Sequence, residues 1–278
     1  MVLSKETNMV YLSELLKVEY PKECDCLTDI LERQNIDYDF LLDTKSVWCR
    51  DYMPIQTATN RFVQFKYKPS YIDNNTLISD GAKVCKQLGI EPILSDIVLD
   101  GGNVTGWNGK VVITDRVFDE NTQYSSRTKL VSQLEKELEA EVIVIPQIKS
   151  SQRGHVDSLL RFFDKDTLIG NNRFEEYSYW SRDLNNILQD YQLSYIDLPF
   201  FHFNDEDYWY NDLGSYINFL EIDNLIIMPI FETDQNRDKE AAEVLQKHYP
   251  DRAIETLNIN DVAFDGGILN SVTWTIKR

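Results

Sequence analysis

The residues best suited to chemistry in this chain lie on five short polar segments, most of them led by glycine. Together they carry three carboxylates, one of only three histidines, and a serine near the C-terminus. We call them the tip segments: residues 48–51 (WCRD), 100–103 (DGGN), 154–157 (GHVD), 214–218 (GSYIN) and 266–271 (GGILNS). Carboxylates brought close together repel one another unless a cation offsets them. If the tip segments meet in space, they predict a site for a positively charged ligand.

Asp51 and Asp157 are the candidate pair for holding that ligand. A guanidinium group presents five N–H donors in one plane, and carboxylates accept them in pairs. His155 lies two residues before Asp157, so on a strand both side chains would share a face. That placement would put a proton carrier beside the bound cation. A metal ion is the alternative cation, but the spacing matches no standard metal motif, and we predict neither a metal nor a cofactor.

The tip segments recur at a nearly constant interval. Their reference residues are 52, 52, 60 and 53 positions apart, counted along Arg50, Gly102, Gly154, Gly214 and Gly267. After the first four come a strand pair, a segment with apolar residues at helical spacing, and a short closing strand. Regular repetition of such units is typical of propellers and other repeat architectures.

The two chain ends are expected to complete the last repeat. It lacks a helix and a closing strand, and residues 21–34 and 36–43 supply patterns for both. Joining the ends would close a ring without exposed sheet edges. The sequence therefore predicts an α/β fold, a five-bladed pseudo-symmetric propeller made by one catalytic domain, residues 1–278, of five ββαβ-like units. Helices are expected near residues 77–88, 125–140, 179–191 and 236–249.

The composition of the chain indicates which classes of binding partner to expect. A net charge of −18 and the absence of a basic patch argue against nucleic acid. No apolar run approaches the roughly 18 to 20 residues that cross a bilayer, and the N-terminus shows no signal-peptide pattern. The four cysteines have no disulfide-like spacing, so a reducing cytoplasm is the expected location. A small cationic ligand is the expected partner, and the oligomeric state is not indicated.

Five motifs resemble, in order, those of the agmatine deiminase and bacterial peptidylarginine deiminase family: WCRDYMP, LDGGN, GHVD, SYINF and DGGILNSVT. This family belongs to the guanidino-group-modifying, or pentein, superfamily. The resemblance runs from about Trp48 to the C-terminus and implies a five-bladed α/β propeller. It also implies hydrolysis of a guanidino group to a ureido product and ammonia, through a covalent cysteine intermediate and without a cofactor.

The resemblance assigns roles to individual positions. It implies that Asp51 and Asp157 clamp the guanidinium, and that His155 protonates the leaving ammonia and then activates water. Asp100 stands where the family usually has a glutamate that orients the histidine or the substrate. Trp48 and Asn218 complete the expected substrate-binding residues.

Ser271 stands at the position of the family's nucleophilic cysteine. A thiol with a pKa near 8.5 is readily deprotonated beside a histidine and a bound cation, whereas a serine hydroxyl needs a strong dedicated base. This form is therefore expected to be nearly inert. An engineered cysteine-to-serine change or a natural pseudoenzyme would give it, and the intact remaining positions favour the first. The alternatives are an amidinotransferase of the same superfamily and a protein that senses a guanidino ligand without chemistry.

The aromatic segment 200–212 either covers the mouth of the site or packs against the domain. Its acids Asp205, Glu206 and Asp207 would hold a distal amine, as agmatine requires, or carry solvated loop charge.

Overall fold

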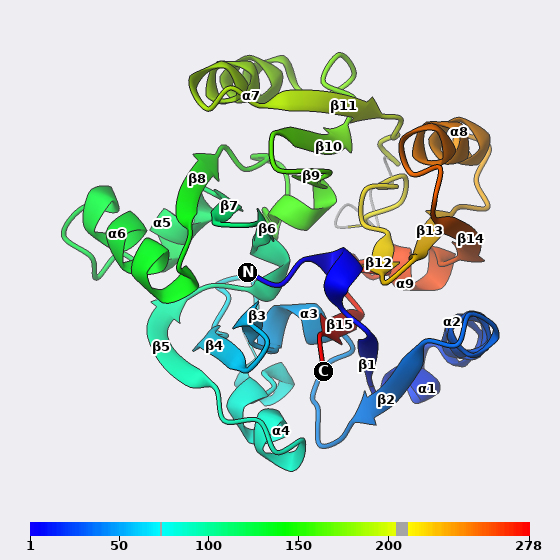
Figure 1. Cartoon of the computed structure of the whole chain (residues 1–278), viewed down its shortest axis with the longest axis horizontal. Helices are drawn as coiled ribbons and strands as arrows, with labels where there is room; N and C mark the ends of the chain where they lie inside the picture. The colour runs from blue at the N-terminus through cyan, green and yellow to red at the C-terminus, as the bar shows by residue number, and fades with distance from the viewer. Residues whose placement is uncertain (73, 204–210) are drawn as a thin grey trace.

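The computed structural model describes residues 1–72, 74–203 and 211–278. Their strands form five three-stranded sheets, arranged as blades around a central axis (Figure 1). In every blade the first two strands are antiparallel and the last two are parallel. A helix on the periphery connects each parallel pair, because parallel neighbours require a crossover.

The blades are numbered in the chain order of their central strands, β1, β4, β7, β10 and β13. Blade 1 contains β15 (Thr273–Ile276), β1 (Met9–Ser13) and β2 (Asp37–Leu41); blade 2 contains β3 (Ile55–Ala58), β4 (Arg61–Lys66) and β5 (Ile93–Val98); blade 3 contains β6 (Thr105–Trp107), β7 (Lys110–Thr114) and β8 (Glu141–Ile145); blade 4 contains β9 (Leu160–Phe162), β10 (Thr167–Asn171) and β11 (Ser194–Leu198); blade 5 contains β12 (Leu220–Ile222), β13 (Leu225–Ile230) and β14 (Ala253–Asn258).

The longest helix of each blade lies on the outside of the ring: α2 (Pro21–Arg33), α4 (Gly81–Gln87), α6 (Arg127–Leu138), α7 (Ser178–Asp190) and α8 (Asp238–His248). Shorter helical elements are α1 (Leu16–Glu19), α3 (Cys49–Tyr52), α5 (Arg116–Glu120), α9 (Asn260–Phe264) and the 3₁₀ turns η1 (Ser4–Glu6), η2 (Asn75–Leu77), η3 (Gly101–Asn103) and η4 (Val156–Ser158).

Helix α6 shows how the sequence builds these units. The Ser126 hydroxyl accepts a backbone N–H bond at 3.2 Å and so caps the first turn. Leu130, Leu134 and Leu138 follow at intervals of four, share one face and are fully buried against the sheet. Glu139 has a left-handed backbone (φ 53°), which ends the helix. Burial of each leucine contributes about 1.5–3 kcal/mol.

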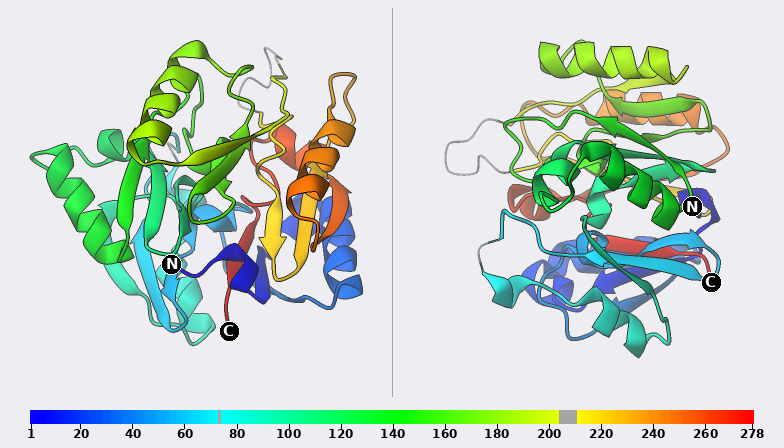
Figure 2. Two further views of the ribbon diagram at one scale, coloured as in Figure 1. Left: turned by 45° about the horizontal axis from the view of Figure 1, so that its top comes forward. Right: turned by 90° about the vertical axis from the view of Figure 1, so that its left-hand side faces the viewer.

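The chain ends pair with each other as the sequence predicts. Strands β1 and β15 are antiparallel, with Met9 opposite Ile276 and Leu12 opposite Thr273. The turned views show the first and last segments side by side (Figure 2). One core cluster joins blade 1 to blade 5, since Leu12 and Leu31 pack in the same cluster as Met228. The five-bladed α/β propeller closed by both chain ends is confirmed.

Two local expectations were wrong. The helix predicted over 77–88 begins only at Gly81, because the Asp80 carboxylate accepts the Lys83 N–H at 3.0 Å and caps the helix there. His155 and Asp157 were expected on a strand, but Asp157 lies in the 3₁₀ turn η4; the tip segments at α3 and η3 also form short helical turns. None of the helices in the described ranges is both long enough and apolar enough to span a bilayer.

Candidate active site

The five tip segments meet at the axis, and hydrogen bonds join them in a closed circuit. Each segment is bonded to the next one around the ring. The links are Gly102 N to Asp51 Oδ1 (3.1 Å), His155 Nε2 to Asp100 Oδ2 (2.9 Å), Asn218 Nδ2 to the Asp157 carbonyl (3.3 Å), Asn270 N to Asn218 Oδ1 (3.0 Å) and Arg50 N to the Ser271 carbonyl (3.1 Å). The circuit brings the sequence-predicted polar residues together from blades that lie far apart in the chain.

Gly102 marks the point where the acids and the histidine converge. A Cβ atom at this position would lie 2.6 Å from Asp51 Oδ1, 2.8 Å from His155 Nδ1 and 3.3 Å from Asp157 Oδ2. The first two distances are too short for any Cβ contact. Glycine is therefore required here for the close approach of three functional side chains.

His155 is buried between carboxylates. Its Nε2 lies 2.9 Å from Asp100 Oδ2 and its Nδ1 lies 3.6 Å from Asp51 Oδ1. Burial alone would lower the pKa of His155, but the charges of Asp51 and Asp100 outweigh it and raise this pKa to about 9. At neutral pH the ring is thus an imidazolium, a form able to donate a proton.

The positive charge of His155 does not fully compensate the buried carboxylates around it. Burial raises the pKa of Asp51, the charges of Asp100 and Asp157 add to the effect, and His155 only partly offsets it. Burial also raises the pKa of Asp157, although His155 and the Asn270 amide act in the opposite direction. Three buried acids around one histidine favour the arrival of a further cation.

Ser271 lies in the turn before β15 and has no base beside it among the described residues. Its Oγ is 3.4 Å from Asn218 Oδ1, and its backbone N–H donates to the same oxygen at 3.3 Å. Within the described part of the chain, no histidine or carboxylate is hydrogen-bonded to this hydroxyl. Activation of a serine nucleophile uses such a hydrogen-bonded base.

Cys49, the cysteine on a tip segment, is not placed to act as a nucleophile. Its thiol is fully buried and donates to the Val272 carbonyl at 3.0 Å. Burial raises the pKa of Cys49 to about 12, so the thiol stays neutral.

A family model described as Porphyromonas-type peptidyl-arginine deiminase matches residues 15–276. The chain belongs to this family. A Listeria monocytogenes protein, provisionally named agmatine deiminase 2, is 37% identical over 60 residues, which span 22% of this chain and 16% of that protein.

Solved structures share the fold of this deiminase-family chain. Agmatine deiminase of C. jejuni superposes with a TM-score of 0.82 at 17% identity, covering 100% of this chain and 95% of that one. A cysteine-to-serine variant of the C. jejuni enzyme with substrate bound gives a TM-score of 0.78 at 18% identity, covering 100% and 96%.

Trp48 lies at the mouth of the site in this deiminase-family chain. Its indole covers Gly267 so closely that a Cβ there would be 2.3 Å from the ring. Trp48, Asp51, Tyr71 and Arg153 line a cavity of about 310 Å³ that leads to the buried acids. The cavity offers room for a ligand that extends outward from Asp51.

Sequence reasoning missed two polar residues. Asn270 donates from Nδ2 to Asp157 Oδ2 at 2.7 Å, and its place beside Ser271 on a tip segment was a signal that could have identified it. Tyr71 donates to Asp100 Oδ2 at 2.8 Å from the connection between β4 and α4. Tyr71 lies outside the repeated tip segments, so the sequence pattern does not indicate it.

The strand argument for His155 and Asp157 was wrong. His155 is extended (φ −79°, ψ 148°) and precedes η4, whereas Asp157 lies within this 3₁₀ turn. Such a turn has three residues per revolution, so a two-residue spacing does not define a common face. The two side chains are nevertheless neighbours, because both converge on Gly102.

Other expectations have partial or no counterparts. Asp205, Glu206 and Asp207 lie outside the described residues. Phe200 and Phe203, from the same aromatic segment, line a separate cavity of about 220 Å³ that reaches His155. In the ranges that the structure describes, no group of three or more His, Cys, Asp or Glu side chains is arranged to hold a metal ion.

Proposed function

We propose that the axial site binds the guanidinium group of a small compound between Asp51 and Asp157. The observation that carries this proposal is the convergence of both carboxylates and His155 on Gly102. Burial raises the pKa of each aspartate, so a planar cation would be stabilised there by charge and by paired hydrogen bonds. The family of guanidino C–N hydrolases to which the chain belongs supports the same ligand class.

With a cysteine at position 271, the axial site would catalyse deimination of the guanidino group. The five blades would together form the single catalytic domain. The thiolate would attack the guanidinium carbon and form a C–S bond, while the π electrons move to nitrogen. His155, as imidazolium, would donate a proton to the leaving nitrogen as the C–N bond breaks and ammonia departs. The neutral imidazole would then take a proton from water, whose oxygen attacks the same carbon and displaces the sulfur. A ureido product remains.

As the chain stands, the site is proposed to bind without turnover. The specific observation is the environment of Ser271, whose hydroxyl faces Asn218 and, among the described residues, no base. His155 is engaged by Asp100 and Asp51 on its two ring nitrogens. A guanidino-binding protein of the cytoplasm is therefore the second candidate function.

Removing either clamp charge is expected to weaken binding. Asp51→Asn and Asp157→Asn should each reduce the affinity for agmatine or another guanidinium ligand by about 10- to 150-fold, which is about 1.5–3 kcal/mol for hydrogen bonds to a charged group. Calorimetric titration measures this. Asp96→Asn is the matched control, since that carboxylate is fully exposed on blade 2. Equal affinities for the clamp variants and the control would remove the guanidinium site.

Binding is also expected to strengthen with pH. Protons on Asp51 and His155 make the site more positive, and so they compete with the ligand. The pKa of Asp51 is raised and that of His155 reaches about 9, so affinity should rise as the pH increases from about 6 towards 9. Three further groups face the imidazole ring of His155: Asp100, Asp157 and Tyr71. The charges of Asp100 and Asp157 raise the pKa of His155, so their own protonation influences its titration.

Because binding releases protons, the affinity for the guanidinium ligand can rise by at most about tenfold per pH unit for each proton released. Titrations in buffers of different ionisation enthalpy count those protons directly. An affinity that is independent of pH, or a net uptake of protons, would contradict the assigned charge states.

A further inference from the structure

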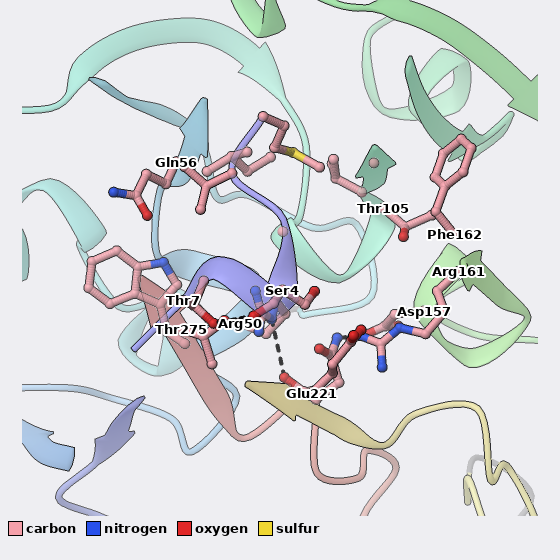
Figure 3. Close-up of a pocket in the computed structure, with 18 of the residues that line it drawn as sticks. Ser4, Thr7, Arg50, Gln56, Thr105, Asp157, Arg161, Phe162, Glu221 and Thr275 are labelled. Carbon is pink, nitrogen blue, oxygen red and sulfur yellow. Dashed lines mark hydrogen bonds between the residues drawn. The ribbon is translucent and has the colours of Figure 1, made fainter. Parts of the chain in front are cut away.

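A third cavity, of about 90 Å³, lies near the ring axis and reaches Asp157 (Figure 3). Asp157 and Asn270 form part of its wall, together with Arg50, Arg161 and Glu221. Among the described residues, it shares no lining residue with the cavity at the mouth of the site. The volume is several times the 10–15 Å³ or so that one water needs, which is enough for a small polyatomic ion.

The guanidinium groups of Arg50 and Arg161 face this cavity, and each has N–H donors without an acceptor among the described residues. Arg50 uses Nε to donate to the Asn270 carbonyl at 3.2 Å, and its two terminal nitrogens have no acceptor in the described ranges. Arg161 donates from one terminal nitrogen to the Phe219 carbonyl at 2.9 Å and stacks on the Phe219 ring at 4.2 Å. Its remaining N–H groups also find no acceptor among the described residues. Figure 3 shows both side chains pointing into the cavity beside Asp157 and Glu221.

The carboxylates that line the cavity form no close ion pair with either arginine among the described residues. Glu221 pairs with Arg252 at 3.2 Å, and Arg252 is not a lining residue. Asp157 accepts from Asn270 and also faces the proposed guanidinium ligand. Burial lowers the pKa of Arg50, the charge of Asp157 acts in the opposite direction, and the charge of Arg161 lowers this pKa further. Two arginines of like charge at one cavity are stabilised by an anion between them.

We propose that the axial cavity is a second binding site, which holds a small oxyanion, a carboxylate or a phosphate, between Arg50 and Arg161. The planar fork of an arginine matches the paired oxygens of both groups. Anchoring of Arg50 on Asn270 and of Arg161 on Phe219 fixes the two forks before the ligand arrives, which lowers the entropic cost of binding.

The two sites should strengthen each other. A guanidinium bound to Asp157 cancels the negative charge that this carboxylate offers to Arg50. The arginine pair then attracts an anion more strongly, and by linkage the anion raises the affinity for the guanidinium by the same factor. This coupling depends on the proposed guanidinium site, whereas binding of the anion alone does not.

Calorimetric titration of the intact protein with inorganic phosphate and with acetate, without any guanidino compound, tests the anion site. The wild-type protein should bind at least one of them, and the tighter one identifies the phosphate or the carboxylate as the natural group. Arg161→Gln should weaken this binding by about tenfold or more. Arg161→Lys keeps the charge but loses the fork and should fall between. Arg182→Gln, on an exposed arginine of α7, is the matched control and should bind as the wild type does.

Two results would overturn the proposal: the wild-type protein binds neither anion, or the Arg161 variants bind as Arg182→Gln does. Thermal unfolding of each variant establishes that it is folded. A second titration, with agmatine in the presence and absence of saturating anion, then measures the coupling. Anion binding with an unchanged agmatine affinity would leave both sites standing and would contradict the coupling through Asp157, whereas anion binding without any agmatine binding would count against the guanidinium site alone.

Discussion

Ser271→Cys should turn the protein into a deiminase that releases ammonia from agmatine, free arginine or an arginine-containing peptide. The change places a thiolate-forming group at a site where Asp51 and Asp157 are proposed to hold the guanidinium and His155 is proposed to supply the proton. Loss of a nucleophile in covalent enzymes costs up to about 10⁶ in kcat. We therefore expect a gain of at least about 10³-fold over the serine form, measured as ammonia production.

The matched control is Ser125→Cys, which puts a thiol on an exposed residue just before the peripheral helix α6. It should leave ammonia release at the level of the serine protein. If Ser271→Cys turns over none of the three substrates while the serine protein binds one of them, a cysteine is not the missing component. The binding function would then replace the enzyme function.

His155→Ala, made in the Ser271→Cys background, should lower turnover by about 10²–10⁴-fold, the usual contribution of a general acid or base. In the proposed mechanism the imidazolium protonates the departing nitrogen, and Asp51 and Asp100 favour this protonated form at neutral pH by raising the pKa of His155 to about 9. Steady-state assays of ammonia release give kcat and KM separately. We expect most of the loss in kcat.

His248→Ala is the corresponding control, because His248 lies on α8 and packs edge-on against Phe163, remote from the tip segments. Near-full turnover of the His155 variant would show that another group moves the proton and that His155 is structural.

The architecture could be predicted because its signals are periodic. Leu130, Leu134 and Leu138 repeat at the helical interval that buries them against blade 3. The tip spacing repeats at the interval of a blade, so the missing last elements could be assigned to the N-terminus. The pairing of β1 with β15 follows from that assignment. Packing interactions that recur in every blade can therefore be predicted from a single sequence.

The site was only partly predictable, because its finer contacts do not recur. Asp51, Asp100, His155 and Asp157 were placed together by the repeat alone. The Tyr71 hydroxyl reaches Asp100 from an irregular connection, and no local pattern marks that contact.

Local backbone geometry was equally hidden from the sequence pattern. Periodicity cannot distinguish a strand start from a 3₁₀ turn when a segment has only four residues. The segment that contains His155 and Asp157 is such a case, and its side chains are placed by the circuit around the axis.

Covalent labelling tests the central claim, a guanidinium site built around position 271, most directly. A haloacetamidine carries an amidinium that Asp51 and Asp157 would hold, with its halide-bearing carbon open to a thiolate. Intact-mass spectrometry of the Ser271→Cys protein should show a single adduct, in which a C–S bond forms and halide leaves, mapped by peptide analysis to residue 271. The serine protein should show no adduct, and excess agmatine should protect the introduced cysteine. A Ser271→Cys protein that stays unlabelled, or labelling that agmatine does not slow, would contradict the account.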